Sequence, residues 1–384
     1  MSKPPPSIDL DGPTQPPLPR RRLTLRRAFT GAGALIVLAL IGSTFTACSP
    51  IYVIRAGIAE AKILAGRRPL VEVIADPTTD PATRNTLILV REARSFAIDQ
   101  LGLNTGNSYT SFTQLESDTL ALVLSAAYRD RLQARTWWFP IVGHVPYRGF
   151  FDEDDALDEQ RDLEDDGYDT WLRPTSAFST LGWFADPLLS SMLYADEVEV
   201  VGTVLHELSH NHLFVPGRVR FNESFATFIG RTAVAEFFCT RQGGGPDTVK
   251  CLRAQARWRD AQKFSAFLDV VVDDLQTIYG DSAQTLDQKV GAREAVFERA
   301  LTRFSEEIQP NFESLTFSSF LSTPLNNATL LSRMRYYHRL ADFEALRVRE
   351  GSVKAALDYL TAGARTGGDP FDLLPGNSRG PSGG

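Results

Sequence analysis

The sequence predicts an α+β fold, with a strand-rich first half and a helical second half. In the first half, short runs that alternate β-branched or aromatic residues with polar ones are separated by Gly and Pro, as strands are. After residue 250, long segments place apolar residues at helical spacing. With 384 residues and 43% hydrophobic side chains, the chain can form a proper core, and it shows no repeat of fixed period.

The individual elements follow from these patterns in chain order. A helix is expected over residues 88–104, and strands at SYTSFTQ, TLALVLSAAYR, WWFPIVG, VPYRGFFD and AFSTLGWF. The acidic segment DEDDALDEQRDLEDDGYD predicts a solvated helix. Calcium binding is the alternative, although the Gly-punctuated spacing of an EF-hand loop is missing. Amphipathic helices are expected at RAQARWRDAQKFSAFLDVVVDDLQTIY, REAVFERALTRFSEEI and NNATLLSRMRYYHRLADFEAL.

The two ends of the chain are expected to lie outside the folded domain, which leaves residues 48–364 as that domain. Residues 1–47 carry RRRLTLRR and then an uncharged apolar run up to Cys48, which is the order of an export signal. The paired arginines suit either an ordinary basic region or a twin-arginine signal. Residues 365–384 are rich in Gly, Pro and polar side chains, which predicts a disordered tail.

The apolar run ends in Phe45-Thr46-Ala47-Cys48, which resembles a bacterial lipoprotein signal with Phe45 in place of the usual Leu. The resemblance implies a lipid anchor on Cys48 at the periplasmic side of the cell envelope, and Ser49 favours the outer membrane. An uncleaved membrane anchor is the alternative, because about 20 apolar residues can span a bilayer. In both cases the body of the protein is exported and attached to a membrane.

Charge and cysteine content exclude some classes of partner. The net charge is −7 and becomes more negative once the basic N-terminal segment is left out, so no nucleic-acid partner is expected. If Cys48 is lipidated, Cys239 and Cys251 remain, and export favours a disulfide between them. A pair of metal ligands is the alternative, but the tight C-x-x-C spacing of a zinc site is missing.

The stretch TVLHELSHNHLFVPGRVRFNESFA holds three of the five histidines in the chain. Asp196 and Glu199, three positions later, form a plausible capping box, and Pro216-Gly217 ends the apolar pattern. A helix is therefore expected over residues 197–213.

Two histidines of this helix can reach one metal ion. At about 100° per residue, His206 and His210 lie within about 40° of each other, one turn apart. Glu207 lies to the side, where its carboxylate can reach a water on the metal and act as a general base. Gly202 leaves room for substrate or metal one turn earlier. His212 falls among apolar positions and is expected to be a hydrogen-bonded histidine facing the core.

A catalytic zinc site needs a third protein ligand, and Glu223 is the candidate. The loop after Pro216 can return the next segment, NESFATFIGRTAVAEFF, as a second helix, so that the carboxylate completes a set of two His, one Glu and a water. A ligand histidine is commonly supported by a carboxylate, and Thr227, one turn after Glu223, carries none, so that supporting role is unassigned.

HELSH followed by NESFA resembles the gluzincin metallopeptidases, although the twelve residues between His210 and Glu223 are fewer than in those enzymes. A nearer resemblance is to a family of predicted aminopeptidases of Gram-negative envelopes, which are often lipoproteins. It rests on CSPIYVIRAGIAEAKILAGRRP, YRGFFD, GYDTWLRPTSAFSTLGWFADPLL, HELSH, RFNESFATFIG and PLNNATLL, in that order over almost the whole exported chain.

The resemblance implies a zincin-like metallopeptidase that holds one Zn²⁺ ion through His206, His210 and Glu223. Glu207 would be the catalytic carboxylate, because zinc lowers the pKa of a water from 15.7 to about 7 and so makes its proton available near neutral pH. The substrate would be a peptide, cleaved from its N-terminus. An endopeptidase is the alternative within this class. A non-catalytic envelope lipoprotein with a structural metal site is the alternative outside it.

Three further residues are assigned by the same resemblance. Tyr337 is chosen from the run Tyr336, Tyr337 and His338 as a donor to the oxyanion, with a helix-core aromatic as the alternative. Gly182 in AFSTLGWF would let a peptide lie along an edge strand, and a plain sheet strand is the alternative. Asp186 is the candidate for anchoring a free amine.

Overall fold

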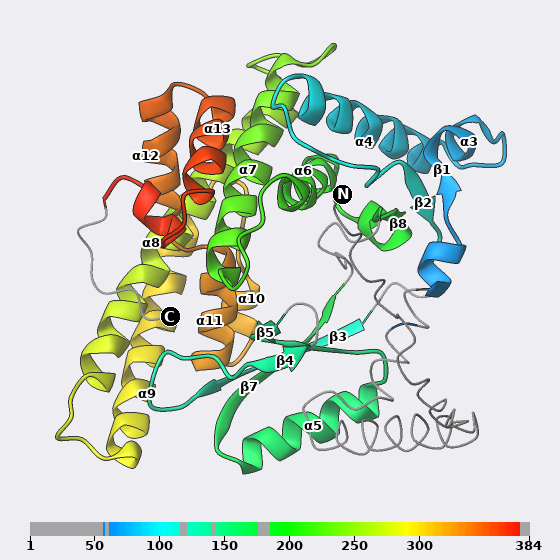
Figure 1. The fold of residues 1–384 in the computed structure, drawn as a ribbon. Helices are drawn as coiled ribbons and strands as arrows, with labels where there is room; N and C mark the ends of the chain where they lie inside the picture. The colour runs from blue at the N-terminus through cyan, green and yellow to red at the C-terminus, as the bar shows by residue number, and fades with distance from the viewer. Residues whose placement is uncertain (1–56, 58–60, 116–120, 140–142, 176–184, 377–384) are drawn as a thin grey trace, which may run out of the picture. The chain divides into compact units, whose positions relative to one another are not determined.

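The computed structural model describes residues 57, 61–115, 121–139, 143–175 and 185–376, all of which belong to one compact unit over residues 51–384 (Figure 1). The expected export signal, its lipidation site Cys48 and the candidate peptide-contacting Gly182 lie outside the described residues. Among the described helices, none is both long enough and apolar enough to cross a lipid bilayer.

The described strands form three small sheets. Their bounds are β1 Arg68–Pro69, β2 Ser111–Thr113, β3 Ala121–Tyr128, β4 Trp137–Phe139, β5 Gly143–Val145, β6 Arg148–Phe150, β7 Tyr168–Thr175 and β8 Leu188–Leu189. The sheet orders are β1-β2-β8, β6-β3-β7 and β4-β5. The longest pairing is antiparallel, between β3 and β7, and runs from Ala121 opposite Thr175 to Tyr128 opposite Tyr168.

Helices make up most of the rest of the described chain. They are α3 Leu70–Ala75, α4 Pro81–Asp99, α5 Glu153–Asp165, α6 Glu197–His212, α7 Val219–Thr240, α8 Val249–Tyr279, α9 Leu286–Arg303, α10 Ser319–Ser322, α11 Asn327–Tyr336, α12 Leu340–Glu350 and α13 Val353–Ala364. Short irregular turns are η1 Ser190–Tyr194, η2 Phe304–Ile308, η3 Gln309–Asn311 and η4 Pro370–Leu373.

The α+β class and the helical second half are confirmed, whereas the first half is less strand-rich than predicted. Its longest element is the helix α4, and the described strands other than β3 and β7 have two or three residues. The acidic segment forms the expected helix, α5. Asp152 caps its N-terminus, and three acidic residues in its first turn favour that end of the helix dipole.

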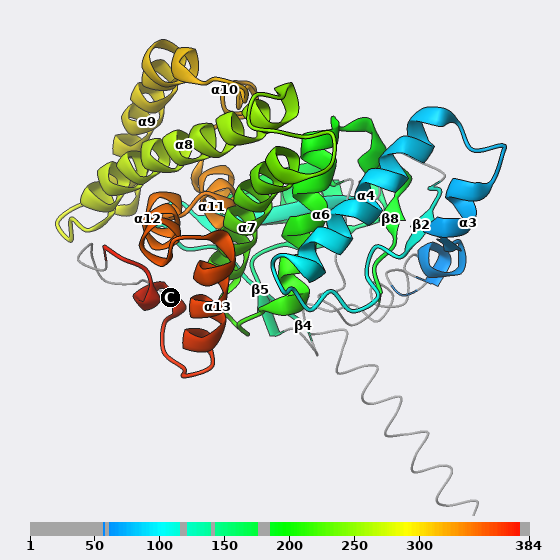
Figure 2. The same cartoon turned by 90° about the horizontal axis from the view of Figure 1, so that it is seen from above.

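The main core surrounds α6, which lies between α4 and α7 (Figure 2). Val201, Val204, Leu205 and Leu208 of α6 are completely buried in this core. In Figure 1 the β6-β3-β7 sheet has α11 above it and α5 below it. The His206 ring of α6 lies 6.2 Å from the ring of Tyr336, the last residue of α11. The histidine-bearing face of α6 is therefore near the end of α11.

The motif PLNNATLL fixes α11 to that sheet. Asn326 caps the helix in a reciprocal capping box with Thr329. Asn327 is completely buried, and its side chain donates to the carbonyl of Tyr128 at 2.8 Å. Its backbone N–H donates to the carboxylate of Asp169 at 3.0 Å. The asparagines of the motif therefore set the position of α11 on the sheet.

Two predictions about the C-terminal region are wrong. The segment expected as one helix around residues 326–346 breaks at residues 337–339, where Arg339 has a left-handed φ of 55°. Residues 365–376, which are the described part of the tail predicted to be disordered, are ordered instead. Phe371 packs edge-on against Phe221 at 5.4 Å, and Leu374 is 3% exposed. Apolar side chains among the Gly and Pro residues supply this packing.

Candidate metal centre

The helix α6 begins as the sequence predicts, but the capping box is incomplete. The Asp196 side chain accepts hydrogen bonds from the backbone N–H groups of Val198 at 3.0 Å and Glu199 at 3.3 Å. The Glu199 carboxylate does not return to the cap, because it accepts from Arg231 of α7 at 2.7 and 3.0 Å. Glu199 therefore joins the two helices that carry the candidate ligands.

The loop between α6 and α7 is closed by Asn222, the residue before Glu223. Its amide oxygen accepts from the backbone N–H of Val215, and its amide nitrogen donates to the carbonyl of the same residue, both at 2.9 Å. Gly217 takes the left-handed φ of 73° that the turn requires. The asparagine of NESFA thus holds the turn that returns α7 toward α6 and places Glu223 opposite the histidines.

The two helices cross closely at a pair of glycines. A Cβ added to Gly230 would lie 2.7 Å from the carbonyl oxygen of Gly202 and 3.0 Å from Cβ of His206. Gly202 was expected to leave room for substrate or metal, and this expectation is wrong. The backbone of α7 lies beside Gly202, where an added Cβ would be 3.6 Å from the Gly230 carbonyl oxygen, so the space there suits a methyl group and not a ligand. Gly230 is the residue that the close crossing requires to have no side chain.

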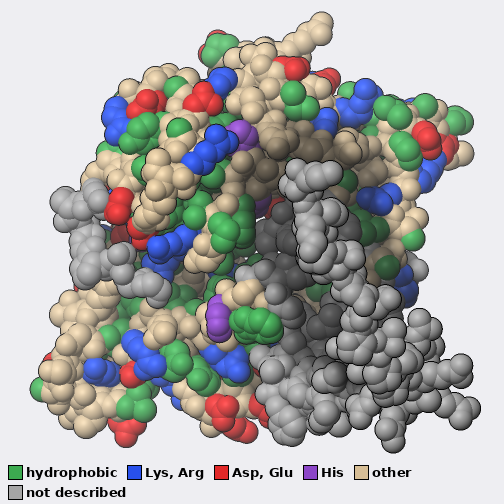
Figure 3. Space-filling model, viewed as in Figure 1, with side chains coloured by type: hydrophobic (Ala, Val, Ile, Leu, Met, Phe, Trp, Pro, Cys, Tyr) green, Lys and Arg blue, Asp and Glu red, His purple; other side chains and the backbone are tan. Residues whose placement is uncertain are grey.

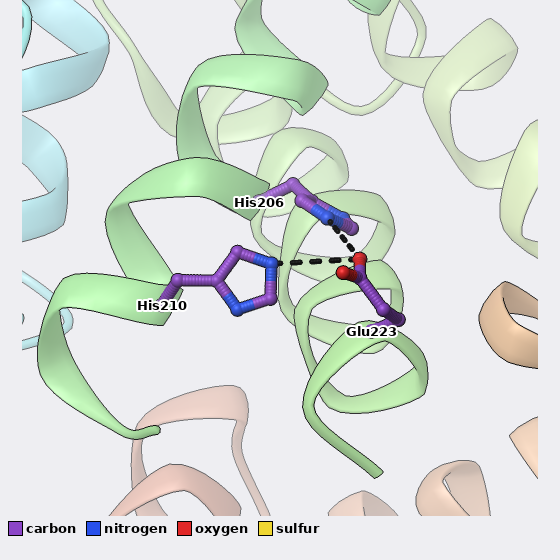
Figure 4. A group of neighbouring side chains, drawn as sticks. All are labelled: His206, His210 and Glu223. Atoms are coloured by element: carbon purple, nitrogen blue, oxygen red, sulfur yellow. Dashed lines mark ion pairs between the residues drawn. The ribbon is translucent and has the colours of Figure 1, made fainter. Parts of the chain in front are cut away.

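The geometry brings His206, His210 and Glu223 together (Figure 4). Oε2 of Glu223 lies 3.3 Å from Nε2 of His206 and 3.6 Å from Nε2 of His210. One ligand atom from each residue lies within 4.8 Å of the others. The His206 and His210 side chains are 15% and 4% exposed, so the cluster is shielded but open on the His206 side.

This donor set fits zinc in its composition and in the two distances from Glu223 to the histidines, while the set as a whole extends over as much as 4.8 Å. Zinc binds imidazole nitrogen and carboxylate oxygen at about 2.0 to 2.2 Å, so two ligand atoms of a tetrahedral site lie roughly 3.3 to 3.6 Å apart. The two distances from Glu223 to the histidines fall in this range. Three protein ligands with a fourth position open are typical of catalytic rather than structural zinc.

The charges in the cluster perturb the pKa of both partners. Burial lowers the pKa of His210, but the charge of Glu223, a hydrogen bond to it and the charge of Glu207 together raise it. Burial raises the pKa of Glu223, and the two histidines outweigh this effect, so that it lies well below its usual range. Nδ1 of His210 is buried without a hydrogen-bond partner among the described residues, so Thr227 does not support this ring.

Glu207 is not part of the group formed by the three candidate ligands. Glu207 is partly buried, and it lies close enough to Tyr109 for its negative charge to shift the pKa of the Tyr109 hydroxyl. Burial, Glu207 and Asp186, in that order, raise the pKa of the Tyr109 hydroxyl well above its usual value. The Tyr109 N–H donates to the carbonyl of Asp186 at 2.7 Å. Asp186 therefore lies in the neighbourhood of Glu207, and sequence reasoning missed Tyr109.

The tyrosine that faces the cluster is Tyr336, not Tyr337. The Tyr336 ring lies 6.2 Å from the His206 ring, and the charge of Glu223 is the main cause that raises its pKa, followed by burial. Tyr337 instead packs edge-on against Phe264 at 5.2 Å, and its hydroxyl is hydrogen-bonded to Arg231. Choosing Tyr337 was wrong because the helix ends at Tyr336, so the two neighbours point to different environments.

A second tyrosine, Tyr147, also lies near the cluster. It is partly buried in the segment after β5, and burial raises its pKa, with Glu223 and Glu207 adding to the effect. It belongs to the YRGFFD motif, which sequence reasoning used only for the family resemblance. No local pattern marks it, because it approaches Glu223 only through the tertiary fold.

The remaining predicted residues are placed as follows. His212 faces away from the cluster. It accepts from the backbone N–H of Asn104 at 3.0 Å and lies 3.2 Å from the hydroxyl of Thr361, which confirms the expected hydrogen bonding, although the side chain is only partly buried. Cys239 and Cys251 are joined by a disulfide between the end of α7 and the start of α8. They therefore take no part in the candidate metal centre.

Comparison with known proteins adds one result to this geometry. A family model described as "Putative aminopeptidase" matches residues 51–359. The chain belongs to this aminopeptidase family. The match contains the three clustered residues, Glu207 and the end of α11, and membership points to peptidase activity. No curated protein and no solved structure matches the chain.

Proposed function

We propose that this member of the aminopeptidase family is a zinc-dependent peptidase that removes residues from the N-termini of peptides. The observation that carries the proposal is the convergence of two imidazole nitrogens and one carboxylate oxygen within 4.8 Å, with Glu207 beside them but outside the set. A structural metal site has no need of this fourth group, whereas hydrolysis needs a base.

His206, His210 and Glu223 would hold the metal, and a zinc ion bound there would polarise the peptide carbonyl and make a water more acidic. Glu207 would take a proton from the attacking water and deliver it to the leaving amine nitrogen. The Tyr336 ring lies 6.2 Å from the His206 ring, and its hydroxyl would donate to the carbonyl oxygen as negative charge develops there. Tyr147, whose pKa is raised by burial and by the charge of Glu223, is a second candidate donor.

Recognition of a free N-terminus requires a negative group near the base. Asp186 is 6% exposed, and the negative charges of Glu207 and Asp186 both raise the pKa of the Tyr109 hydroxyl. This shared neighbour supports Asp186 as the amine anchor. Endopeptidase activity, which needs no such anchor, is the alternative.

The test compares zinc-loaded wild type with Glu207→Gln on peptides with free and blocked N-termini, with and without a chelator. The variant should keep its zinc and its thermal melting temperature and lose about 10²- to 10⁴-fold in cleavage rate. Glu197→Gln is the matched control, because Glu197 lies on the first turn of the same helix with a 41% exposed side chain. Unchanged cleavage by Glu207→Gln would reject the mechanism, and cleavage of blocked peptides only would make it an endopeptidase.

We further propose that the enzyme works on the periplasmic side of the cell envelope, attached to a membrane. The Cys239–Cys251 disulfide supports this location, because disulfides persist in oxidising compartments. Metabolic labelling with a fatty acid, compared between wild type and Cys48→Ala, tests the anchor. A label retained in the variant would reject lipidation at Cys48.

A further inference from the structure

Among the described residues, two buried arginines lack a carboxylate partner, Arg333 and Arg335, and they differ in what they contact. The Arg333 side chain donates to the backbone carbonyls of Thr329 at 3.2 Å and Ser319 at 2.9 Å. Other arginines are paired with acids: Arg293 binds Asp169 at 2.7 and 2.9 Å, and the partly buried Arg231 binds Glu199 at 2.7 and 3.0 Å. Arg335, in the last turn of α11, is only 6% exposed. Within the described part of the chain, no carboxylate lies in ion-pair distance of it.

Arg335 is held beside the candidate ligands by short contacts. Its guanidinium carbon lies 4.9 Å from the centre of the Tyr147 ring. Its backbone carbonyl accepts a hydrogen bond from the hydroxyl of Ser224 at 3.0 Å, and Ser224 is the residue after Glu223. Tyr336, the next residue of α11, faces His206. Arg335 therefore borders the same space as the cluster.

Two further arginines add positive charge at this place. Arg173 of β7 acts with Arg335 on the hydroxyls of Tyr147 and Tyr336, lowering their pKa against the effect of Glu223. Arg220, in the first turn of α7, is near enough to Arg335 for the two charges to repel. Neither arginine forms an ion pair with any described residue. Figure 3 shows acidic and basic side chains interspersed over the described part of this face.

The guanidinium of Arg335 is thus free to bind an anion, and a planar carboxylate is the group that fits it best through paired hydrogen bonds. We propose that Arg335, assisted by Arg173 and Arg220, binds a carboxylate of the peptide substrate at the metal centre. The carboxylate is either the C-terminus of a short peptide or an acidic side chain of a longer one. The inference rests on the proposed peptidase function and adds a preference for substrates with a negative charge near the cleaved bond.

The first experiment measures kcat/KM of the zinc-loaded wild type on two matched pairs of peptides with free N-termini. One pair is trialanine and its C-terminal amide. The other pair is Ala-Glu-Ala amide and Ala-Gln-Ala amide. At least one carboxylate peptide should be cleaved about 10- to 100-fold better than its neutral partner, the range expected for a charged hydrogen bond. The first pair identifies a C-terminal carboxylate as the source and the second an acidic side chain. Equal rates within both pairs would overturn the proposal.

The second experiment separates this proposal from the proposed function by measuring binding without cleavage. The four peptides are titrated calorimetrically into zinc-loaded Glu207→Gln, alone and combined with Arg335→Gln or Arg173→Gln. The preference for carboxylate should be lost with Arg335→Gln and reduced with Arg173→Gln. A preference that survives both substitutions would overturn the proposal, because the metal itself would then bind the carboxylate.

Arg91→Gln is the matched control, because Arg91 is exposed on α4, away from the cluster, and should keep the full preference. If no peptide is cleaved but the titrations show a preference for carboxylate peptides that depends on Arg335, the proposed peptidase function fails and the carboxylate site stands. If peptides are cleaved without preference, only the carboxylate site fails. Should Arg335→Gln not fold, Arg173→Gln and the wild-type peptide pairs still decide the outcome.

Discussion

Gly230 lies so close to Gly202 that a methyl group on its Cα would stand 2.7 Å from the Gly202 carbonyl oxygen. The same methyl group would lie 3.0 Å from Cβ of the candidate ligand His206. The separation of α6 and α7 is therefore set by a glycine beside the metal centre. Because His206 and Glu223 come from these two helices, the distance between them depends on this crossing.

Gly230→Ala should consequently destabilise the protein by about 1 to 3 kcal/mol through overpacking and should also weaken zinc binding. Gly202→Ala is the matched control. Its methyl group would make an ordinary contact of 3.6 Å with the Gly230 carbonyl, and Ala gains up to about 1 kcal/mol over Gly in a helix. Urea unfolding and zinc titration of both variants measure the contrast. Equal behaviour of the two variants would show that the crossing does not set the site.

The candidate ligands could be predicted from the sequence because their geometry is local. His206 and His210 are one helical turn apart, and Glu223 follows after a loop so short that the next helix must return beside the first. Tyr147 and Arg335 could not be found in this way, because they reach the cluster through the β6-β3-β7 sheet and the docking of α11. The sequence holds no spacing that connects them with the histidines.

The choice between Tyr336 and Tyr337 failed for a related reason. Helical periodicity continues through this segment, whereas the structure ends α11 at Tyr336. Ser224 of α7 donates to the carbonyl of Arg335 at 3.0 Å and accepts from the backbone N–H of His338 at 3.3 Å. A contact between helices distant in sequence thus accompanies the end of the helix, and periodicity cannot show such a contact.

Replacement of each tyrosine by phenylalanine should separate catalysis from stability. Tyr336→Phe should keep the fold and the zinc but lower kcat by about 10²- to 10³-fold, as for other oxyanion donors. Tyr337→Phe should keep kcat and lose about 1 kcal/mol of stability, because its hydroxyl is hydrogen-bonded to Arg231. Steady-state kinetics and thermal melting measure both effects. If Tyr337→Phe lost more of its kcat than Tyr336→Phe, Tyr337 would be the oxyanion donor, as predicted from the sequence.

Zinc affinity should fall as the pH decreases. In the metal-free protein, the charges of Glu223 and Glu207 raise the pKa of His210 despite its burial. A proton on His210 competes with the metal, so the zinc affinity decreases as the pH falls through this raised pKa. Calorimetric zinc titrations between about pH 5.5 and 8, around the range where histidine titrates, measure the slope. An affinity independent of pH would contradict the assignment of His210 as a ligand.

The stability of the metal-free protein should depend on pH in the opposite sense. The folded pKa of His210 lies above its unfolded value, so its stabilising contribution is complete below about pH 6.5 and is lost as the pH rises through the folded pKa. The folded pKa of Glu223 is lowered, so its contribution is present above about pH 4.3 and is lost as the pH falls toward the folded pKa. In chelator, the difference in stability between wild type and Glu223→Gln should be largest between about pH 4.5 and 6.5. A difference that grows above this range would refute the pairing.

The closure of the α6–α7 loop by Asn222 gives a test of how the third ligand is positioned. Asn222 is 2% exposed, and its amide both accepts from and donates to the backbone of Val215 at 2.9 Å. Asn222→Ala leaves both groups of Val215 without this partner and should cost about 1 to 3 kcal/mol of stability for each group that stays buried. Asn222→Asp keeps the acceptor for the N–H but places a charged oxygen against the Val215 carbonyl, so it should also be destabilised. Both variants should bind zinc more weakly than wild type, because Glu223 follows directly in the chain.

Asn311→Ala, at an exposed asparagine, is the control in the same urea and zinc titrations. Loss of stability without any loss of zinc affinity would show that α7 positions Glu223 independently of the loop.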